Sequence, residues 1–235
     1  MENLTYLNLR PSAGGSFSFG WKKMFEKAFL PLLVAVILVG LLNGPSGGLK
    51  FNFDSNGFDG PFLFLLPLAL FGLAYAFLFL PVIKYGENYL FLKAMRDEDA
   101  DIKILFEGFK SKYLDIILAH LIVFALAAIG FVMLIIPGFI VVCRLAFVPY
   151  LVMDKDLDAM KAVEKSWQMT RGHGWTIFGM GIISIFVFFA GVLVFIVGAI
   201  FSVMWIHAAF ASMYQAVLNE SDDDNPIPIL GVNEE

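Results

Sequence analysis

The chain contains few of the residues on which most enzymes and disulfide-linked proteins depend. Its 235 residues include three histidines and a single cysteine, and only 16% of them are charged. With Cys143 as the one cysteine, a disulfide within the chain is excluded. Ordinary soluble domains are about 25% charged, so a typical water-exposed surface is not expected.

Motifs of common enzyme classes are also missing. The sequence has no GxxxxGK[ST] phosphate loop and no dinucleotide-binding fingerprint. Its histidines, His120, His173 and His207, belong to no close set of His, Cys, Asp and Glu with zinc spacing. A hydrolase needs a nucleophile, a base and an orienting group, or several metal ligands, in one place. We therefore expect a protein that is not an enzyme and has no metal and no cofactor.

Apolar residues, in contrast, are in excess. They make up 59% of the chain, and the mean hydropathy is +0.79. Crossing the hydrocarbon core of a membrane takes about 20 helical residues, and six runs reach or approach that length. They are residues 24–42, 61–83, 114–136, 139–153, 175–198 and 199–218. A soluble fold is disfavoured because buried helices rarely stay apolar on all faces, and a β-barrel because the runs do not alternate.

Basic residues lie almost entirely on one side of these runs. Of the 16 Lys and Arg residues, 14 precede the first run or lie between the second and third or the fourth and fifth; Lys50 and Arg144 are the exceptions. The positive-inside rule makes that side cytoplasmic and places both termini there. Short connectors are expected at Pro137–Gly138 and Gly198. The net charge of −5, with acids mixed among the bases, indicates no nucleic-acid partner.

A weak internal repeat adds to this organisation. Residues 97–107 and 154–164 correspond at an offset of 57, and 19–29 is a weaker third copy. The matched pairs are Asp97 with Asp154, Asp99 with Asp156, Asp101 with Asp158, and Glu107 with Glu164. Each copy has the apolar spacing of a short amphipathic helix. The expected fold is an all-α integral membrane protein of six transmembrane helices in three hairpins, each preceded by a short cytoplasmic interfacial amphipathic helix.

The acidic residues of the repeat resemble the start of a calcium loop. Asp154, Asp156 and Asp158 have the right spacing, but Ala159 stands where the loop needs glycine and Lys165 where it needs glutamate. Acidic residues at the start of a helix satisfy free N–H groups and suit the helix dipole. We interpret them as helix caps.

The stretch SWQMTRGHGWTIF, residues 166–178, admits two interpretations. Its glycines, Gly172 and Gly174, are expected to end the amphipathic helix, and Trp175 to begin the next span at the membrane interface. Alternatively, Arg171 and His173, beside Trp175, contact a lipid phosphate or another anion at the start of that span.

Three polar side chains lie within the predicted spans. Arg144 costs about 2.5–3.5 kcal/mol at a helix centre, so we expect it to face other helices, a cavity or a headgroup; Asp115 and Tyr150 are candidate partners. His120 and His207 either line a path for a proton or substrate together with Arg144, or make hydrogen bonds between helices.

Several segments carry a resemblance to known proteins. GENYLFLKAMRDEDADIKILFEGFKSKY, LIIPGFIVVCRLAFVPYLVMD and AVEKSWQMTRGHGWTIF together resemble an uncharacterised family of bacterial multi-pass membrane proteins. They are distantly similar to the membrane domain fused to some glycerophosphodiester phosphodiesterases. The resemblance covers residues 80–185. It implies a six-span protein of a bacterial cytoplasmic (inner) membrane, with no catalytic residue to carry over.

Two functions of different classes follow. The first is a non-enzymatic, lipid-contacting scaffold or accessory subunit of a membrane complex. Its partners would be membrane lipids and other membrane proteins, met through the cytoplasmic face and an acidic, disordered C-terminal tail at residues 219–235. The second is a small-molecule or ion transporter or channel, with Arg144, His120 and His207 along the path.

Overall fold

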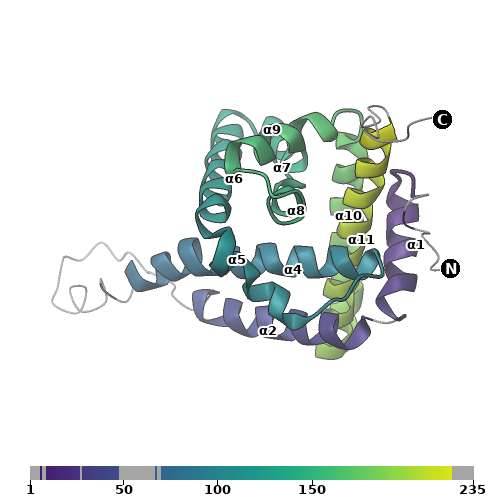
Figure 1. Ribbon diagram of the computed structural model, residues 1–235. Helices are drawn as coiled ribbons and strands as arrows, with labels where there is room; N and C mark the ends of the chain where they lie inside the picture. Colours follow the sequence, from purple (N-terminus) through teal and green to yellow (C-terminus); the bar gives the residue numbers. More distant parts are fainter. Residues whose placement is uncertain (1–5, 7–8, 27, 48–66, 68–69, 224–235) are drawn as a thin grey trace, which may run out of the picture.

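The computed structural model describes residue 6 and residues 9–26, 28–47, 67 and 70–223, and Figure 1 shows their arrangement. Within these residues every regular element is a helix. The α-helices are α1 (Ala13–Met24), α2 (Phe29–Gly47), α4 (Leu80–Met95), α5 (Glu107–Ser111), α6 (Tyr113–Met133), α7 (Ile135–Arg144), α8 (Val148–Asp154), α9 (Ala159–Met169), α10 (Gly174–Leu193) and α11 (Phe195–Asp223). A π-helix, η2 (Tyr75–Phe79), leads into α4, and a 3-10 helix, η3 (Ile102–Phe106), precedes α5.

Five helical segments are long and apolar enough to cross a membrane. They are Leu70–Met95, Tyr113–Met133, Ile135–Asp154, Gly174–Leu193 and Val197–Ser221. A sixth is obtained only if α1 and α2, which meet at an angle of 105°, are counted together as one bent span. The prediction of an all-helical chain with several membrane-length helices is confirmed.

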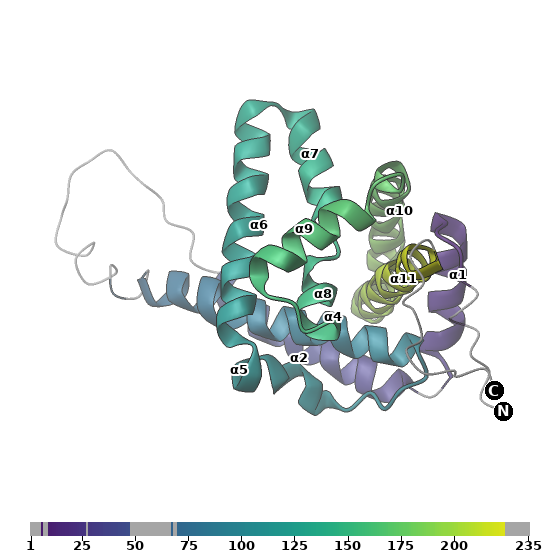
Figure 2. The ribbon, with the colours of Figure 1, turned by 45° about the horizontal axis from the view of Figure 1, so that its top comes forward.

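Helix α4 lies at the centre of the molecule. It packs against α2, α8, α11 and η3, and most of its side chains are buried. Figures 1 and 2 show α4 running between α2 and the other long helices. Gly86 permits the close approach of η3, since a Cβ atom there would lie 2.6 Å from the Leu105 carbonyl oxygen. The packing of α4 against four neighbours therefore fixes the orientation of the side chains it carries.

Two consecutive pairs of helices pack along each other, α6 with α7 and α10 with α11. The predicted positions of the connectors are wrong. The chain turns at Leu134, which is extended, and at Val194, whereas Pro137 and Gly138 lie inside α7 and Gly198 lies inside α11. Proline is tolerated in the first turn of a helix because its missing N–H would have no partner there.

The glycines of these pairs serve close packing instead of turns. The backbone of Gly138 lies so near Gly130 that a Cβ on Gly130 would be 3.0 Å from its Cα. A Cβ on Gly191 would be 2.5 Å from the Gly198 carbonyl oxygen. Small residues at such crossings let helix backbones approach each other.

Two other predicted boundaries also need correction. Of the run predicted at 61–83, residues 70–83 belong to a helical segment that continues to Met95, and residues 61–66, 68 and 69 lie outside the described part of the chain. Lys84 and Glu87 therefore lie inside a membrane-length helical segment. Polar residues end an apolar run in the sequence, but they do not end a helix whose other faces pack against neighbours.

The run predicted at 139–153 lies within the membrane-length segment Ile135–Asp154, in which a turn at residues 145–147 separates α7 from α8. Helix α11 reaches Asp223, so residues 219–223 of the predicted tail are helical, and residues 224–235 lie outside the described residues. The Asn219 side chain explains part of this extension, since it accepts a hydrogen bond from Gln215 one turn earlier.

The short polar helices agree with the sequence in part. Ala159, Ala162 and Val163 of α9 are buried, as predicted. The earlier copy divides into η3 and α5, and its capping residue is Asp101, whose carboxylate accepts the Lys103 backbone N–H. That hydrogen bond lowers the pKa of Asp101.

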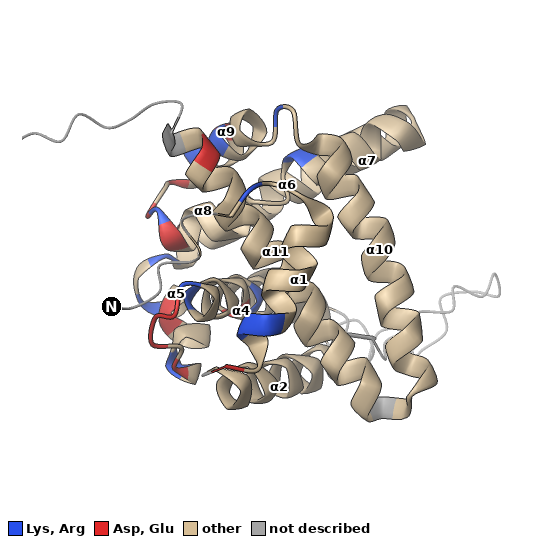
Figure 3. Cartoon of the chain, turned by 90° about the vertical axis from the view of Figure 1, so that its right-hand side faces the viewer, with Lys and Arg blue, Asp and Glu red and all other residues tan. Residues whose placement is uncertain are grey.

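Charged residues gather on one side of the molecule. In Figure 3 the coloured segments lie around α5, α9 and α1, whereas the far ends of α7 and α10 carry none. The helix ends on that uncoloured side also expose large apolar side chains, among them Val132, Leu193 and Phe195. The described part of the chain is thus polarised from a charged face to an apolar one.

Candidate functional site

The end of α7 is held by the amphipathic helix α9. The last carbonyl groups of a helix have no partner within it. The Ser166 hydroxyl donates to the Arg144 carbonyl oxygen at 2.8 Å, and the buried Thr170 hydroxyl lies 3.3 Å from the same oxygen. These backbone contacts fix the position of Arg144 independently of its side chain.

The Arg144 guanidinium group has no acidic partner in the described part of the chain. One N–H donates to the Trp167 carbonyl oxygen at 3.3 Å, and the group lies 5.5 Å from the centre of the Trp167 ring. The candidate partners, Asp115 and Tyr150, are therefore not the ones it uses. An aromatic ring attracts a cation but is neutral, so the guanidinium charge is not balanced by this contact.

Arg144 lies in a groove of about 490 Å³ between α7 and the start of α10. We call it the Arg144 groove; its lining residues are Ile136, Phe139, Ile140, Cys143, Arg144, Gly172, Gly174, Trp175 and Phe178. Helix α10 begins here without a side-chain cap, so its first N–H groups have no capping side chain. Trp175 is 86% exposed, as expected of an aromatic anchor at a membrane surface.

Residues of the stretch 166–178 therefore surround Arg144, whereas the sequence had suggested Asp115 and Tyr150 as its partners. Gly172 adopts the left-handed conformation that ends a helix, with φ of 87°, whereas Gly174 begins α10. Arg171 is exposed and its side chain makes no hydrogen bond to any described residue. His173 lies 3.4 Å from the Glu220 carboxylate of α11, so it joins the start of α10 to the end of α11.

The three predicted intramembrane polar residues do not come together. Arg144 lines its groove, and His207 stacks on Phe91 with ring centres 5.2 Å apart. His120 lies edge-on to Phe77, with centres 6.3 Å apart, and lines neither this groove nor the cavity that contains His207.

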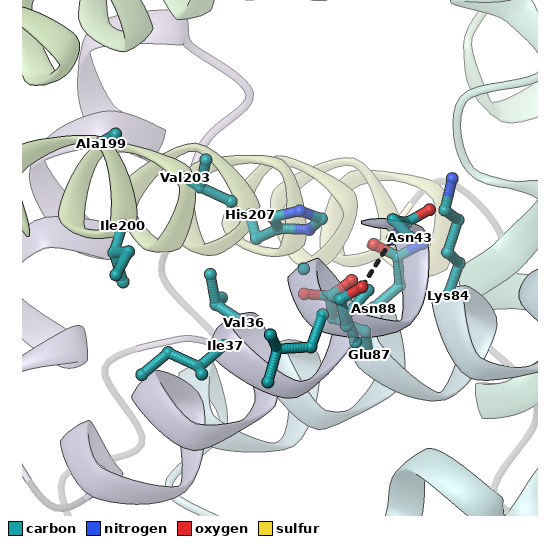
Figure 4. Close-up of a pocket in the computed structure, with 13 residues that line it drawn as sticks. Val36, Ile37, Asn43, Lys84, Glu87, Asn88, Ala199, Ile200, Val203 and His207 are labelled. Carbon is teal, nitrogen blue, oxygen red and sulfur yellow. Dashed lines mark hydrogen bonds between the residues drawn. The ribbon is translucent and has the colours of Figure 1, made fainter. Parts of the chain in front are cut away.

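His207 belongs to a second cavity, of about 660 Å³, which lies between α2, α4 and α11 and is open on one side (Figure 4). We call it the Glu87 cavity; its lining residues are Val36, Ile37, Val39, Gly40, Leu41, Asn43, Lys84, Glu87, Asn88, Ala199, Ile200, Val203 and His207. Lys84, Glu87 and Asn88 recur at the spacing of one helix face, a signal that was present in the sequence. It was missed because the predicted span stopped at residue 83.

A third polar group joins three helices near the charged side. Arg96, just after α4, donates two N–H bonds to Asp154 at the end of α8, one of them at 2.9 Å. Tyr214 of α11 donates to the same carboxylate at 3.0 Å, and the Arg96 Nε–H donates to Gln215 at 2.6 Å. Burial lowers the pKa of Arg96, but its hydrogen bonds and attraction to Asp154 outweigh this effect and raise it.

Comparison with known protein families identifies one matching segment of the chain but assigns it no activity. Residues 108–220 match a family described as a domain of unknown function (DUF7847). This segment is just under half of the chain and holds Arg144 and His207, while Glu87 precedes it. No curated protein and no solved structure matches the chain.

Proposed function

We propose that the protein is a non-enzymatic, lipid-contacting membrane module that holds the anionic headgroup of a phospholipid in the Arg144 groove. The observation that carries the proposal is the Arg144 guanidinium, which stands beside an uncapped helix start and has no carboxylate partner among the described residues. Open N–H groups at a helix start favour anions, and arginine matches a phosphate with two N–H bonds.

The walls of the groove suit the rest of such a lipid. Ile136, Phe139 and Ile140 are exposed apolar side chains of α7 that lead away from the cation. Arg144 stands halfway along the membrane-length segment Ile135–Asp154 and shares its groove with the first residue of α10. A lipid phosphate held beside the guanidinium offsets the cost of placing this cation within a span.

The proposal includes the finer topology. Six spans in three hairpins, with α1 and α2 together as the bent first span, α5 and α9 at the interface and both termini in the cytoplasm, account for the single charged face and the distribution of basic residues. The bacterial cytoplasmic membrane and the role as accessory subunit, with partners at the charged face, rest on the resemblance of residues 80–185. A transport path through Arg144, His120 and His207 has less support, because these residues lie in three different surroundings.

Two arginine variants test the lipid site. The protein would be placed in nanodiscs of equal phosphatidylglycerol and phosphatidylcholine, and the lipids it retains counted by native mass spectrometry. We expect the native chain to retain phosphatidylglycerol preferentially. Arg144→Gln should reduce that preference by about tenfold, the value of one charge-assisted hydrogen bond.

Arg171→Gln is the matched control, because Arg171 is exposed, lies near the same helix start and has no hydrogen-bond partner for its side chain in the described chain. Its lipid preference should equal that of the native protein. Loss of the preference in Arg171→Gln, with Arg144→Gln unaffected, would move the headgroup contact to the exposed loop and disprove the groove.

A further inference from the structure

The Glu87 cavity has two chemically different ends. Polar side chains of α4, α2 and α11 gather at one end in Figure 4, among them Glu87, Asn43 and His207. The other end is walled by aliphatic side chains such as Ile37 and Ile200. Its volume of about 660 Å³ is within the range of small-molecule sites. The shape and chemistry fit an amphiphile with a polar head and an apolar chain.

The Glu87 carboxylate is the buried polar group of this cavity. Glu87 is only 3% exposed, and it makes no hydrogen bond to any described residue. Burying a carboxylate without a partner is costly, and intramembrane acids usually mark a functional site. In the part of the chain that the structure describes, no fully buried side-chain oxygen or nitrogen lacks a hydrogen-bond partner, so the Glu87 oxygens open onto the cavity. His207 and Lys84 line the same cavity and attract the carboxylate without a hydrogen bond, which leaves room for a donor from a ligand.

A metal ion is a poor match for this position. Among the described residues, no group of three or more His, Cys, Asp and Glu side chains is arranged to hold one. Calcium takes six to eight oxygen ligands and structural zinc takes four. An anion is disfavoured by the charge of the carboxylate, and a route for protons alone would not need the long aliphatic wall.

We propose that the Glu87 cavity binds an amphiphile that carries a primary ammonium group. The ammonium group donates to the Glu87 carboxylate at the polar end, which Asn88 also lines, and the apolar chain lies along Ile200 and Val203. A free long-chain amine and the headgroup of an aminophospholipid share this chemistry. The exposed Lys84 is placed to meet the phosphate of the latter.

This site is separate from the Arg144 groove in its residues and in the charge it selects. The two cavities share no lining residue. Arg144→Gln should therefore leave amine binding unchanged, so that failure of either proposal is recognised independently of the other.

The direct test uses dodecylamine with the protein in phosphatidylcholine nanodiscs, and follows the thermal unfolding midpoint by tryptophan fluorescence. A ligand that binds only the folded state raises the midpoint in a saturable way. We expect this for dodecylamine and not for dodecanol, which has the same chain without the charge. Glu87→Gln, which keeps the shape of the side chain, should weaken the response by about tenfold. An equal response from Glu87→Gln, or from dodecanol, would overturn the proposal.

A second variant keeps the carboxylate and fills the space. A Cβ atom on Gly40 would meet no atom within 4 Å, so Gly40→Leu is sterically tolerated and projects into the cavity. A leucine at this position of the cavity wall should weaken the dodecylamine response at least tenfold while the protein stays folded, and a response equal to that of the native protein would count against the cavity as the amine site. This variant keeps the proposal testable should Glu87→Gln fail to fold.

The source of the amine is identified by native mass spectrometry from nanodiscs of mixed phosphatidylethanolamine and phosphatidylcholine. Retention of phosphatidylethanolamine that is lost in Glu87→Gln supports the proposal with the headgroup as ligand. Dodecylamine binding without such retention supports it with a free amine. The absence of both would overturn it.

Discussion

Two buried carboxylates of this protein have opposite surroundings. The Asp154 side chain, 6% exposed, accepts hydrogen bonds from Arg96 and Tyr214, so its charge is matched within the fold. Glu87, 3% exposed, lies about two helical turns before the end of α4 and accepts none from any described residue. The same functional group is thus part of the scaffold at one site and open to a ligand at the other.

The chain has few charged residues, and this contrast offers a way to tell which of them serve the fold and which are available to a ligand. A buried charge with its partners in the fold ties elements together, here the ends of α4 and α8 and the second half of α11. A buried charge without them costs stability and persists when something outside the fold compensates for it. Removing each carboxylate should therefore have effects of opposite sign.

The largest effect is expected for Asp154→Asn. The substitution leaves the largely covered Arg96, whose side chain is 13% exposed, without a counter-charge. Breaking a fully buried ion pair costs about 3–5 kcal/mol, which sets the upper limit of the loss. The free energy of unfolding in mixed detergent and sodium dodecyl sulfate micelles measures the loss. Asp156→Asn is the control, because Asp156 pairs with Lys112 but is exposed, and should change stability little.

Replacing both partners refines this test. The double variant Arg96→Met with Asp154→Leu removes the pair without leaving a lone charge and should recover much of the lost stability. If the double variant is as unstable as Asp154→Asn, the hydrogen bonds to Tyr214 and Gln215 are what hold the three helices together.

Glu87→Gln should have a smaller effect of the other sign. The amide has the same shape and is cheaper to bury than an unpaired carboxylate, so without ligand the stability should be equal to or greater than that of the native protein. The same micelle unfolding experiment measures it. A loss as large as that of Asp154→Asn would show that Glu87 is a scaffold residue, and the contrast between the two carboxylates would fail.

The sequence predicts the helical class well because apolar runs of membrane length are a strong signal. It misplaces the turns because glycine has two uses. Gly138 and Gly198 were assigned to connectors, but both lie inside helices, where they allow close contact with Gly130 and Gly191. The sequence alone does not distinguish a glycine that forms a turn between helices from a glycine inside a helix that lets another helix pack closely.

The candidate sites show a similar division. Trp175 was placed correctly at the start of a long apolar helix, but the cation that shares its groove is Arg144 and not the neighbouring Arg171. Arg144 ends α7 and Trp175 lies in the first turn of α10, so only the packing of these two helices brings them together. Glu87 was missed because a polar residue lowers the hydropathy of the run that contains it.

The smallest effect is expected at Asp158, an exposed carboxylate with a partner. Its side chain is 62% exposed and lies 2.7 Å from the Lys161 ammonium group. The hydrogen bond and attraction of Lys161 lower the pKa of Asp158 below its usual value. Because the pKa in the folded state is the lower one, any stabilisation is present above the usual aspartate pKa of about 3.9 and is lost as pH falls through the folded value.

Water screens this pair, so Asp158→Asn should leave the unfolding midpoint at pH 7 unchanged. The carboxyl resonance of Asp158, followed by NMR as the pH is lowered, should titrate below the usual aspartate range. A midpoint shift as large as that of Asp154→Asn would mean that burial does not decide the strength of these pairs. The contrast between Asp154 and Glu87 would then need a cause other than the partners that each carboxylate has within the fold.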